Sequence, residues 1–239
     1  MISLSGMTRT FQVGAEQTPV FDDVTVNLPT DRHCAILGGE QSGKSVLIRI
    51  LAGVEEATRG SIVRYASLSF PVGFVRAFRA QLTARQNVEH AARLYGADPN
   101  EVAGFVDGVT GLGMLMNEPV RRLQLRDRVT LAYAMSYAIP FDTYLIDENI
   151  ALGSVEFREV CHAMFAHRAR QSGFLLATRN VRKALDYCDC AAVILDHKIV
   201  LFDDMKDAID AYQAQMARRP AGPPSAVGRA PEPAPADGF

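Results

Sequence analysis

The sequence has no tryptophan, only four cysteines, and no long apolar run. The cysteines are Cys34, Cys161, Cys188 and Cys190, and they match no zinc-ligand spacing, because the lone C-x-C pair has no second pair to complete a site. We therefore expect free thiols in a reducing compartment. A membrane-spanning helix needs about 20 predominantly apolar residues. No stretch approaches that length, so the sequence predicts no transmembrane segment.

Strong charge of either sign is also absent. The formal net charge is -2 at pH 7, which gives no reason to expect nucleic acid as a partner. The first six residues lack both the basic start and the apolar core of a signal peptide. We expect the protein to stay in the cytoplasm, with another component holding it if it works at a membrane.

The composition changes once, near Ala217. Residues 218–239 hold half of the prolines, few large apolar residues and no periodicity. Such a segment buries too little apolar surface to offset the entropy of ordering, so we predict a disordered tail. Residues 1–217 are expected to form the folded domain.

Apolar patterns before the tail alternate between strand and helix. Strands are predicted at residues 24–28, 33–37, 144–146, 174–177, 191–195 and 199–202, and helices at 43–52, 123–138, 154–171 and 181–187. This alternation predicts an α/β fold with a parallel sheet. From 82 to 113 the pattern is helical, with Thr83 and Gln86 as a capping box and Gly96 as a stop. The block from about 80 to 138 is too long for one crossover, so we expect an inserted helical subdomain.

A glycine-rich motif lies between the strand at 33–37 and the helix that follows. It matches G-x-x-x-x-G-K-[ST] and reads Gly38-Gly39-Glu40-Gln41-Ser42-Gly43-Lys44-Ser45. Its glycines let backbone N–H groups surround phosphates, and the helix N-terminus adds partial positive charge. Lys44 is expected to reach the β- and γ-phosphates of ATP, and the Ser45 hydroxyl to ligate Mg²⁺. The structural alternative is an ordinary glycine turn before a helix, but the strand–loop–helix order favours a phosphate loop.

Two carboxylates follow the apolar strand at 144–146. Asp147, at the carboxyl end of the strand, is placed to hold Mg²⁺ through water, and Glu148 is placed to polarise an attacking water. Alone, such a pair is usually the polar start of a loop. Together with the phosphate loop, it predicts a nucleotide hydrolase with Glu148 as the catalytic residue.

The spacing of Lys44 and Asp147, with a helical block between them, resembles an ABC-type nucleotide-binding domain. Residues 51–53 and 60–62 also resemble the stretch that follows the phosphate loop in that superfamily. Phe11 falls where the superfamily stacks an aromatic ring on adenine, with simple packing as the alternative. The resemblance implies an ATP site made of Phe11, the phosphate loop and Val46.

Within the superfamily, several segments are similar to capsular-polysaccharide exporter ATPases. They are residues 70–74, 82–83, 87–88, 94–96 and 141–148, and the likeness spans about residues 1–212. It implies a peripheral subunit at the cytoplasmic face of the inner membrane. It also implies a head-to-tail homo- or heterodimer with a second nucleotide-binding subunit, beneath a membrane permease that exports a surface polysaccharide. The cargo follows from family likeness alone.

The sequence departs from this family where turnover is controlled. The signature motif ordinarily supplies a serine and two glycines to the γ-phosphate of the facing subunit. Here it falls on Leu123-Gln124-Leu125-Arg126-Asp127, with neither glycine present. Arg79 takes the place of the glutamine that senses Mg²⁺, Arg179 that of the switch histidine, and Ser154 the acidic position of the aspartate loop.

The phosphate loop departs as well, with Gln41 at a usual glycine and Val46 at a usual threonine. Two interpretations stay open. Drift would leave a hydrolysis-deficient ATP-binding subunit with a regulatory or scaffolding role, not itself driving transport. Alternatively, Arg79, Arg126 and Arg179 bring positive charge to the γ-phosphate, as arginine fingers do in other nucleotide hydrolases.

Overall fold

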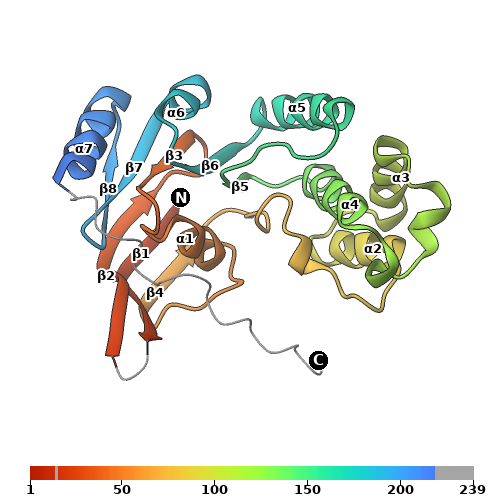
Figure 1. Ribbon diagram of the computed structural model, residues 1–239, viewed down its shortest axis with the longest axis horizontal. Helices are drawn as coiled ribbons and strands as arrows, with labels where there is room; N and C mark the ends of the chain where they lie inside the picture. The colour runs from red at the N-terminus through yellow and green to blue at the C-terminus, as the bar shows by residue number, and fades with distance from the viewer. Residues whose placement is uncertain (14–15, 219–239) are drawn as a thin grey trace.

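Figure 1 shows the computed structural model of the chain, which describes residues 1–13 and 16–218. One lobe holds the β-strands, and a second lobe holds helices from the middle of the chain. The predicted tail lies outside the described residues, apart from Arg218, which ends helix α7 (Met205–Arg218). Patterns in the sequence predict no element after residue 202, so α7 is an addition to the predicted fold.

The main sheet has five strands. In spatial order they are β5 (Thr143–Asp147), β6 (Gly173–Thr178), β3 (His33–Leu37), β7 (Cys190–Leu195) and β8 (Lys198–Phe202). The first four run parallel, as predicted, and β8 pairs antiparallel with β7. Asp196 and His197 form the two-residue turn between them, with φ of 43° and 67°. Two left-handed residues in succession match a tight hairpin turn.

A second, antiparallel sheet was not predicted. Its strand order is β2 (Glu16–Leu28), β1 (Ile2–Val13) and β4 (Arg59–Arg64). The expected strand at 24–28 is the end of β2 and belongs to this antiparallel sheet. Register shifts interrupt β1 between Leu4 and Thr10 and break its apolar alternation. Every residue of β4 is exposed or half-buried, so this strand has no apolar face to detect.

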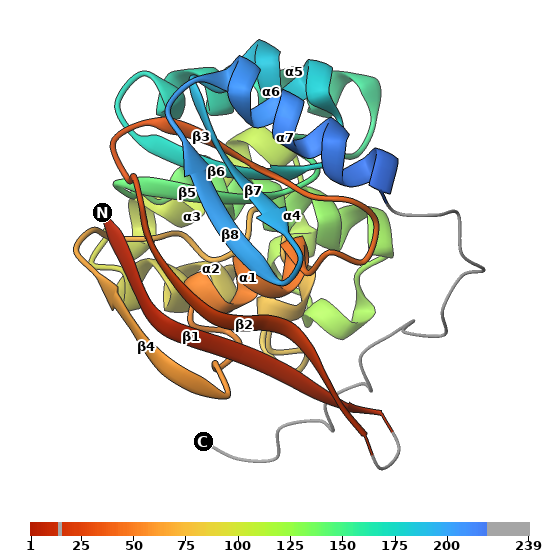
Figure 2. The same ribbon diagram turned by 90° about the vertical axis from the view of Figure 1, so that its left-hand side faces the viewer.

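Helix α1 (Lys44–Leu51) packs between the two sheets. Its residues Leu47, Ile48, Ile50 and Leu51 are buried in a core shared with β1, β2 and the parallel strands. Figure 2 shows β1 and β2 side by side on one side of the molecule, with α6 (Val181–Tyr187) and α7 across the main sheet from them. The helix α1 that follows the phosphate loop is therefore packed between the antiparallel sheet and the main sheet.

The second lobe is helical. It contains α2 (Ala84–Leu94), α3 (Pro99–Thr110) and α4 (Leu125–Ala138), with 3-10 turns η1 (Val75–Ala77), η2 (Gly113–Asn117) and η3 (Val120–Arg122). Helix α5 (Val155–Ala169) packs on β5 and β6. The capping box is confirmed: the Thr83 hydroxyl accepts from the Gln86 N–H at 3.1 Å, and the Gln86 side chain accepts from the Thr83 N–H at 3.0 Å.

Within the described part of the chain, no helix has both the length and the apolarity needed to cross a bilayer.

Candidate functional site

The glycine-rich loop joins β3 to α1. Lys44 is the first residue of the helix and is only 8% exposed. Its Nζ donates to the carbonyl oxygens of Gly38 and Gly39 at 2.9 and 2.7 Å. Gly43 has φ of 94°, and a Cβ there would lie 2.4 Å from the Val20 Cγ1 atom. The loop therefore needs glycine at this position, both for backbone conformation and for packing against β2.

The loop is suited to an anion. Gly43 caps α1 without a side-chain hydrogen bond, so the helix N-terminus keeps its partial positive charge for a ligand. Burial lowers the pKa of Lys44, while the nearby carboxylates Glu148 and Asp147 oppose that shift by favouring the ammonium form. A bound polyphosphate would favour the charged lysine in the same way.

The other loop residues surround this lysine. Glu40 and Gln41 are exposed, and Gln41 has φ of 60° where the family resemblance expects glycine. The Ser42 Oγ atom is buried with no hydrogen-bond partner among the described residues. Ser45 is half-buried in the first turn of α1, and Val46 packs against the core between the sheets. The structure therefore gives Val46 a packing contact, and its place in the nucleotide site stays a prediction.

Asp147 ends β5, beside the end of β6, where it pairs with Ala177. Its Oδ1 atom is buried and has no hydrogen-bond partner among the described residues. Such an orphaned oxygen fits a metal ion with its bound water. Nowhere in the described ranges do three or more His, Cys, Asp or Glu residues gather as a metal cage. Mg²⁺ at Ser45 and Asp147 would thus depend on phosphate and water oxygens to complete its coordination.

Glu148 is fixed at the edge of the same site. Its backbone has φ of 63°, a left-handed conformation that costs energy for a non-glycine residue and is often found at functional sites. Its carboxylate accepts from the Thr178 hydroxyl at 3.1 Å and from the Arg179 N–H at 3.2 Å. Its carbonyl oxygen accepts a hydrogen bond from Lys183 Nζ. The side chain is therefore oriented by the end of β6.

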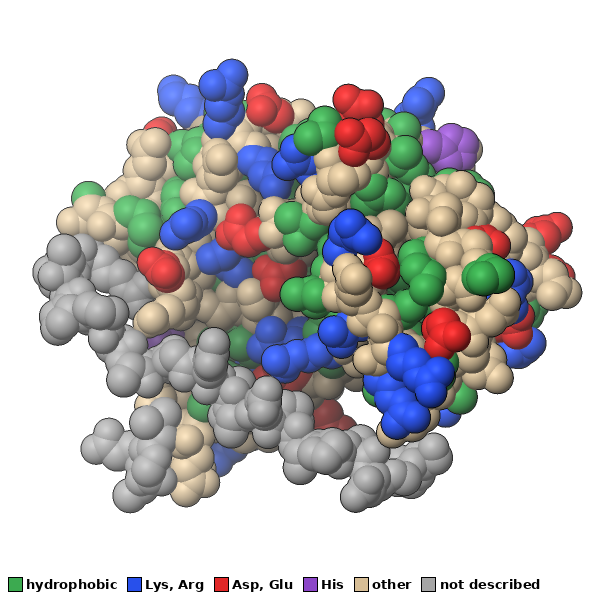
Figure 3. All heavy atoms as spheres, turned by 45° about the vertical axis from the view of Figure 1, so that its right-hand side comes forward, with side chains coloured by type: hydrophobic (Ala, Val, Ile, Leu, Met, Phe, Trp, Pro, Cys, Tyr) green, Lys and Arg blue, Asp and Glu red, His purple; other side chains and the backbone are tan. Residues whose placement is uncertain are grey.

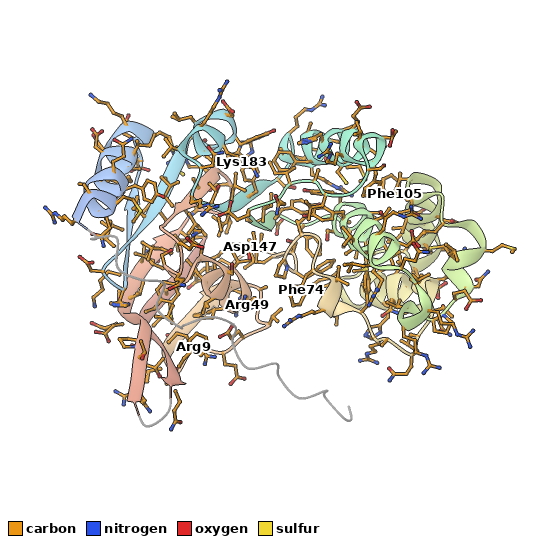
Figure 4. All side chains as sticks on the ribbon, viewed as in Figure 1. Arg9, Arg49, Phe74, Phe105, Asp147 and Lys183 are labelled. Carbon is orange, nitrogen blue, oxygen red and sulfur yellow. The ribbon has the colours of Figure 1, made fainter. Side chains whose placement is uncertain are left out.

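Thr178 and Lys183 were not among the predicted site residues. Thr178 is fully buried, and burial lowers the pKa of Lys183. Lys183 lies in the first turn of α6, after the N-cap residue Asn180. Figure 4 labels Lys183, on α6, and Asp147, at the end of β5. No motif signals these two residues in the sequence, because their role depends on how β6 and α6 meet β5.

The three arginines at control positions are placed differently. Arg179 reaches the phosphate loop, where its guanidinium lies 3.9 Å from the Glu40 carboxylate. Arg126 instead pairs with its neighbour Asp127 at 3.3 Å and is 73% exposed. Arg79 is exposed, and its backbone N–H and carbonyl are both bound by the Asn87 side chain at 2.8 and 3.1 Å.

The segment at the signature position begins α4. Leu123 is buried, and Gln124 is the N-cap residue without a side-chain hydrogen bond. Leu125 is 64% exposed on the surface of the helical lobe. Ser154, at the aspartate-loop position, has a local structural role: it caps α5 by accepting from the Phe157 N–H at 3.3 Å.

Helix α4 also joins the helical lobe to the carboxylate loop. The hydroxyls of Tyr133 and Tyr137 donate to the carbonyls of Asn149 and Ile150 at 3.2 and 2.8 Å. The Ser136 hydroxyl accepts from the Gly73 N–H at 3.2 Å. The segment that starts at the signature position is thus tied to the residues that follow Glu148.

Phe11 lies on β1, half-buried and paired with Thr18 of β2. The Arg9 guanidinium carbon lies 4.7 Å from the centre of its ring. Two and three residues after Thr18 in β2, Val20 and Phe21 line Gly43. Phe11 therefore belongs to the strand pair that borders the phosphate loop.

No family model matches the chain. Curated relatives do. The polysialic acid transport ATP-binding protein KpsT of Escherichia coli is 30% identical over 216 residues, which covers 89% of this chain and 96% of that protein. The capsule polysaccharide export ATP-binding protein CtrD of Neisseria meningitidis serogroup B is 32% identical over 214 residues, covering 90% and 99%. The ATP-binding protein BexA of Haemophilus influenzae is 32% identical, covering 89% and 98%.

Solved structures agree on the fold. The dimeric ATP-binding cassette MJ0796 in a post-hydrolysis state, bound to ADP and Pi, superposes with a TM-score of 0.66 at 17% identity. The match covers 83% of this chain and 96% of that one. The fold is that of an ABC nucleotide-binding domain, and the identity to relatives along nearly their whole length shows that this chain belongs to the capsular-polysaccharide exporter family of ABC transporter ATP-binding subunits.

Proposed function

We propose that this chain binds Mg²⁺-ATP in the loop from Gly38 to Ser45 and powers export of a capsular or other surface polysaccharide across the inner membrane. The observation that carries the proposal is the proximity of Lys44 and Asp147. The lysine is buried on the loop carbonyls, and Asp147 lies close enough for its charge to favour the ammonium form. One oxygen of that carboxylate is buried without a hydrogen-bond partner among the described residues. The cargo is inferred from the names of the Escherichia coli and Neisseria meningitidis relatives.

Each side chain takes a separate part in nucleotide binding. Lys44 exchanges its two carbonyl acceptors for β- and γ-phosphate oxygens, and the N–H groups of the loop and of the first turn of α1 donate to the same phosphates. Ser45 and Asp147 hold Mg²⁺, which neutralises phosphate charge when bound. Phe11 stacks on adenine.

Glu148 acts as the catalytic residue. Its carboxylate orients a water molecule beside the γ-phosphate and accepts a hydrogen bond from that water. The Thr178 hydroxyl and the Arg179 N–H hold the carboxylate in position. Arg179 is the arginine that the geometry favours as a substitute for the switch histidine. Its guanidinium already contacts the phosphate loop through Glu40.

A second nucleotide-binding subunit and a membrane permease are the proposed partners. The structural relative MJ0796 is dimeric, which supports a head-to-tail pair in this chain as well. Helix α4 would face the partner's nucleotide. The hydrogen bonds of Tyr133 and Tyr137 would couple a movement of α4 to the loop after Glu148. The permease would hold the subunit at the cytoplasmic face of the membrane.

A regulatory or scaffolding subunit with little turnover is the second candidate. It is favoured by one observation: Leu125 and Arg126 are exposed where the family resemblance expects two glycines. Purification of the chain together with a candidate permease separates the two, because a scaffold has no need to bind the permease.

Nucleotide titration tests the site itself. In the presence of Mg²⁺, Lys44→Ala should weaken ATP binding by about tenfold to a hundredfold, because it removes a charge-assisted contact to two phosphates. Gly104→Ala, in the middle of α3 and away from the loop, is the control. Equal affinity of the wild type and Lys44→Ala would refute the site.

A further inference from the structure

Arg9 is held on the face of the Phe11 ring by an ion pair. Its guanidinium carbon is 4.7 Å from the ring centre, well within the range of a cation–π contact. Its Nε and Nη2 atoms donate to one carboxylate oxygen of Glu55, Oε1, at 2.9 and 2.7 Å. The guanidinium is therefore fixed both by the stack and by the ion pair.

Glu55 links this arginine to a second one. Its other carboxylate oxygen accepts from the Nε of Arg49 at 2.9 Å. The backbone N–H of Glu55 also donates to the Arg49 carbonyl at 3.2 Å. The Glu55 side chain is only 16% exposed and that of Arg9 only 22%. Because the carboxylate is shielded between two guanidinium groups, these pairs are weakened less by solvent and salt than surface pairs are.

The network connects the two ends of the proposed ATP site. Arg49 lies in α1, the helix that begins with Lys44, and Glu55 lies in the loop after that helix. Figure 4 shows Arg49 on α1 and Arg9 on the adjoining antiparallel sheet. The aromatic ring on β1 is thus joined through Arg9, Glu55 and Arg49 to the helix that carries the phosphate-binding lysine.

We propose that Arg9, anchored by Glu55, is a positioning residue that holds the Phe11 ring ready to stack on the adenine base. The inference rests on the proposed function, in which Phe11 receives adenine. With the planar guanidinium on one face of the ring, the base would stack on the opposite face. A ring that is already fixed loses less conformational freedom on binding, and affinity increases for that reason.

Base-dependent affinity is the readout that separates positioning from a structural role. The probes are Mg²⁺-ATP and inorganic tripolyphosphate, which offers phosphates but no base. Arg9→Gln should weaken ATP binding about threefold to tenfold, in line with loss of one cation–π contact and of ring order. It should leave tripolyphosphate binding unchanged. Arg9→Lys keeps the charge without the planar stack, and should restore only part of the ATP affinity.

Arg64→Gln is the matched control. Arg64 comes from the same antiparallel sheet and donates to the carbonyls of Ile50 and Leu51 at the end of the same helix, at 2.8 and 2.7 Å. Its loss should lower the melting temperature without changing the ratio of ATP to tripolyphosphate affinity. A change in that ratio as large as that caused by Arg9→Gln would overturn the inference. It would show that any contact between the antiparallel sheet and α1 affects ATP affinity, whether or not the contact involves the Phe11 ring.

Phe11→Ala completes a double-mutant cycle. In that background, Arg9→Gln should have no further effect on ATP affinity. If Phe11→Ala leaves ATP binding unchanged, the adenine site of the proposed function is wrong. If Phe11→Ala weakens ATP binding and Arg9→Gln does not, only the role of Arg9 is refuted. Should Arg9→Gln fail to fold, Glu55→Gln is the second variant. It removes the ion pair that holds the guanidinium but keeps Arg9 itself, so it should give the same base-dependent loss in smaller measure.

Discussion

Single residues of the phosphate loop combine burial with charge, and Lys44 shows the consequence most directly. Its ammonium group is buried against two backbone carbonyls, and burial lowers its pKa. The lysine therefore loses its proton at a lower pH in the folded protein than in the unfolded chain. Its contribution to stability rises as the pH increases from the lowered pKa toward the ordinary lysine value, because the cost of burying the charge disappears in that window.

Nucleotide affinity should change with pH in the opposite direction. A bound triphosphate favours the charged lysine, so binding is accompanied by proton uptake above the lowered pKa, and ATP affinity should fall as the pH rises through it. The measurement is the ATP dissociation constant across the alkaline range, where the phosphates are already ionised. Lys44→Arg, whose charge does not titrate there, should flatten the dependence. An equally steep slope in Lys44→Arg would assign the titration to another group.

Glycine positions provide a matched pair of predictions at this scale. Gly43→Ala places a methyl group 2.4 Å from Val20 and 2.9 Å from Phe21, at φ of 94°. We expect a loss of stability of about 2–4 kcal/mol, from overpacking together with backbone strain. Gly108→Ala has no atom within 4 Å and lies inside α3, so it should stabilise the protein by about 0.5–1 kcal/mol. Denaturant unfolding of both variants tests the pair, and a neutral Gly43→Ala would contradict it.

Among the secondary-structure elements, the main sheet and its flanking helices α1, α5 and α6 were predictable. The runs at 33–37 and 181–187 match β3 and α6 to the residue, since each is bounded by clear start and stop signals. The antiparallel sheet was not predictable in the same way. Register shifts hide the alternation of β1, and β4 has no buried face. Helix α7 buries only Ala208 and Tyr212, a stripe too narrow to stand out in a polar segment.

Only part of the candidate site could be predicted from the sequence. The loop from Gly38 to Ser45 is continuous in sequence, so its motif could be recognised without a structure. Thr178, Lys183 and Arg9 come from other elements, and their roles depend on which strands are neighbours. Of the three arginines at control positions, the structure places Arg179 in contact with the loop, a distinction that the sequence left open.

Helix α4 is the element that connects the two lobes. The Tyr137 hydroxyl is buried and donates to the Ile150 carbonyl at 2.8 Å. Tyr137→Phe should cost about 1–2 kcal/mol of stability, because the variant leaves a buried carbonyl without its donor. Thermal unfolding measures the loss, and Tyr65→Phe, at an exposed position, is the control. A Tyr137→Phe variant as stable as the control would show that this contact does not hold the lobes together.

The charge distribution over the whole molecule bears on the partner subunit. Figure 3 shows Lys and Arg side chains gathered in a compact group on the helical lobe. Exposed arginines in that lobe include Arg121, Arg122 and Arg126, and two of these have an acidic neighbour within an ion-pair distance. Because the start of α4 lies here, a head-to-tail dimer would bring this surface toward a nucleotide bound to the partner.

In the proposed head-to-tail dimer, turnover would depend on both subunits. In a homodimer, each Lys44 site would face the partner's segment 123–127, in which Leu125 and Arg126 stand where glycine permits close approach. Loss of one or two such contacts in the transition state costs about 10²- to 10³-fold in rate. Glu148 is held in place by Thr178 and the Arg179 N–H, so we expect slow hydrolysis of ATP by the purified protein and a further loss in Glu148→Gln.

Variants of Arg179 distinguish the two interpretations of the altered control positions, drift and replacement by arginine. If its guanidinium serves the γ-phosphate within the same chain, Arg179→Ala should lower steady-state turnover about tenfold or more while Arg179→His retains part of it. Arg93→Ala, which removes an exposed arginine of α2 paired with Glu89 at 3.2 Å, should leave turnover unchanged. Brisk wild-type hydrolysis that is lost in both Glu148→Gln and Arg179→Ala would exclude drift. Turnover that is equal in the wild type and Glu148→Gln would instead identify a nucleotide-binding subunit that depends on a partner carrying an intact signature segment, because only such a partner completes the Lys44 site.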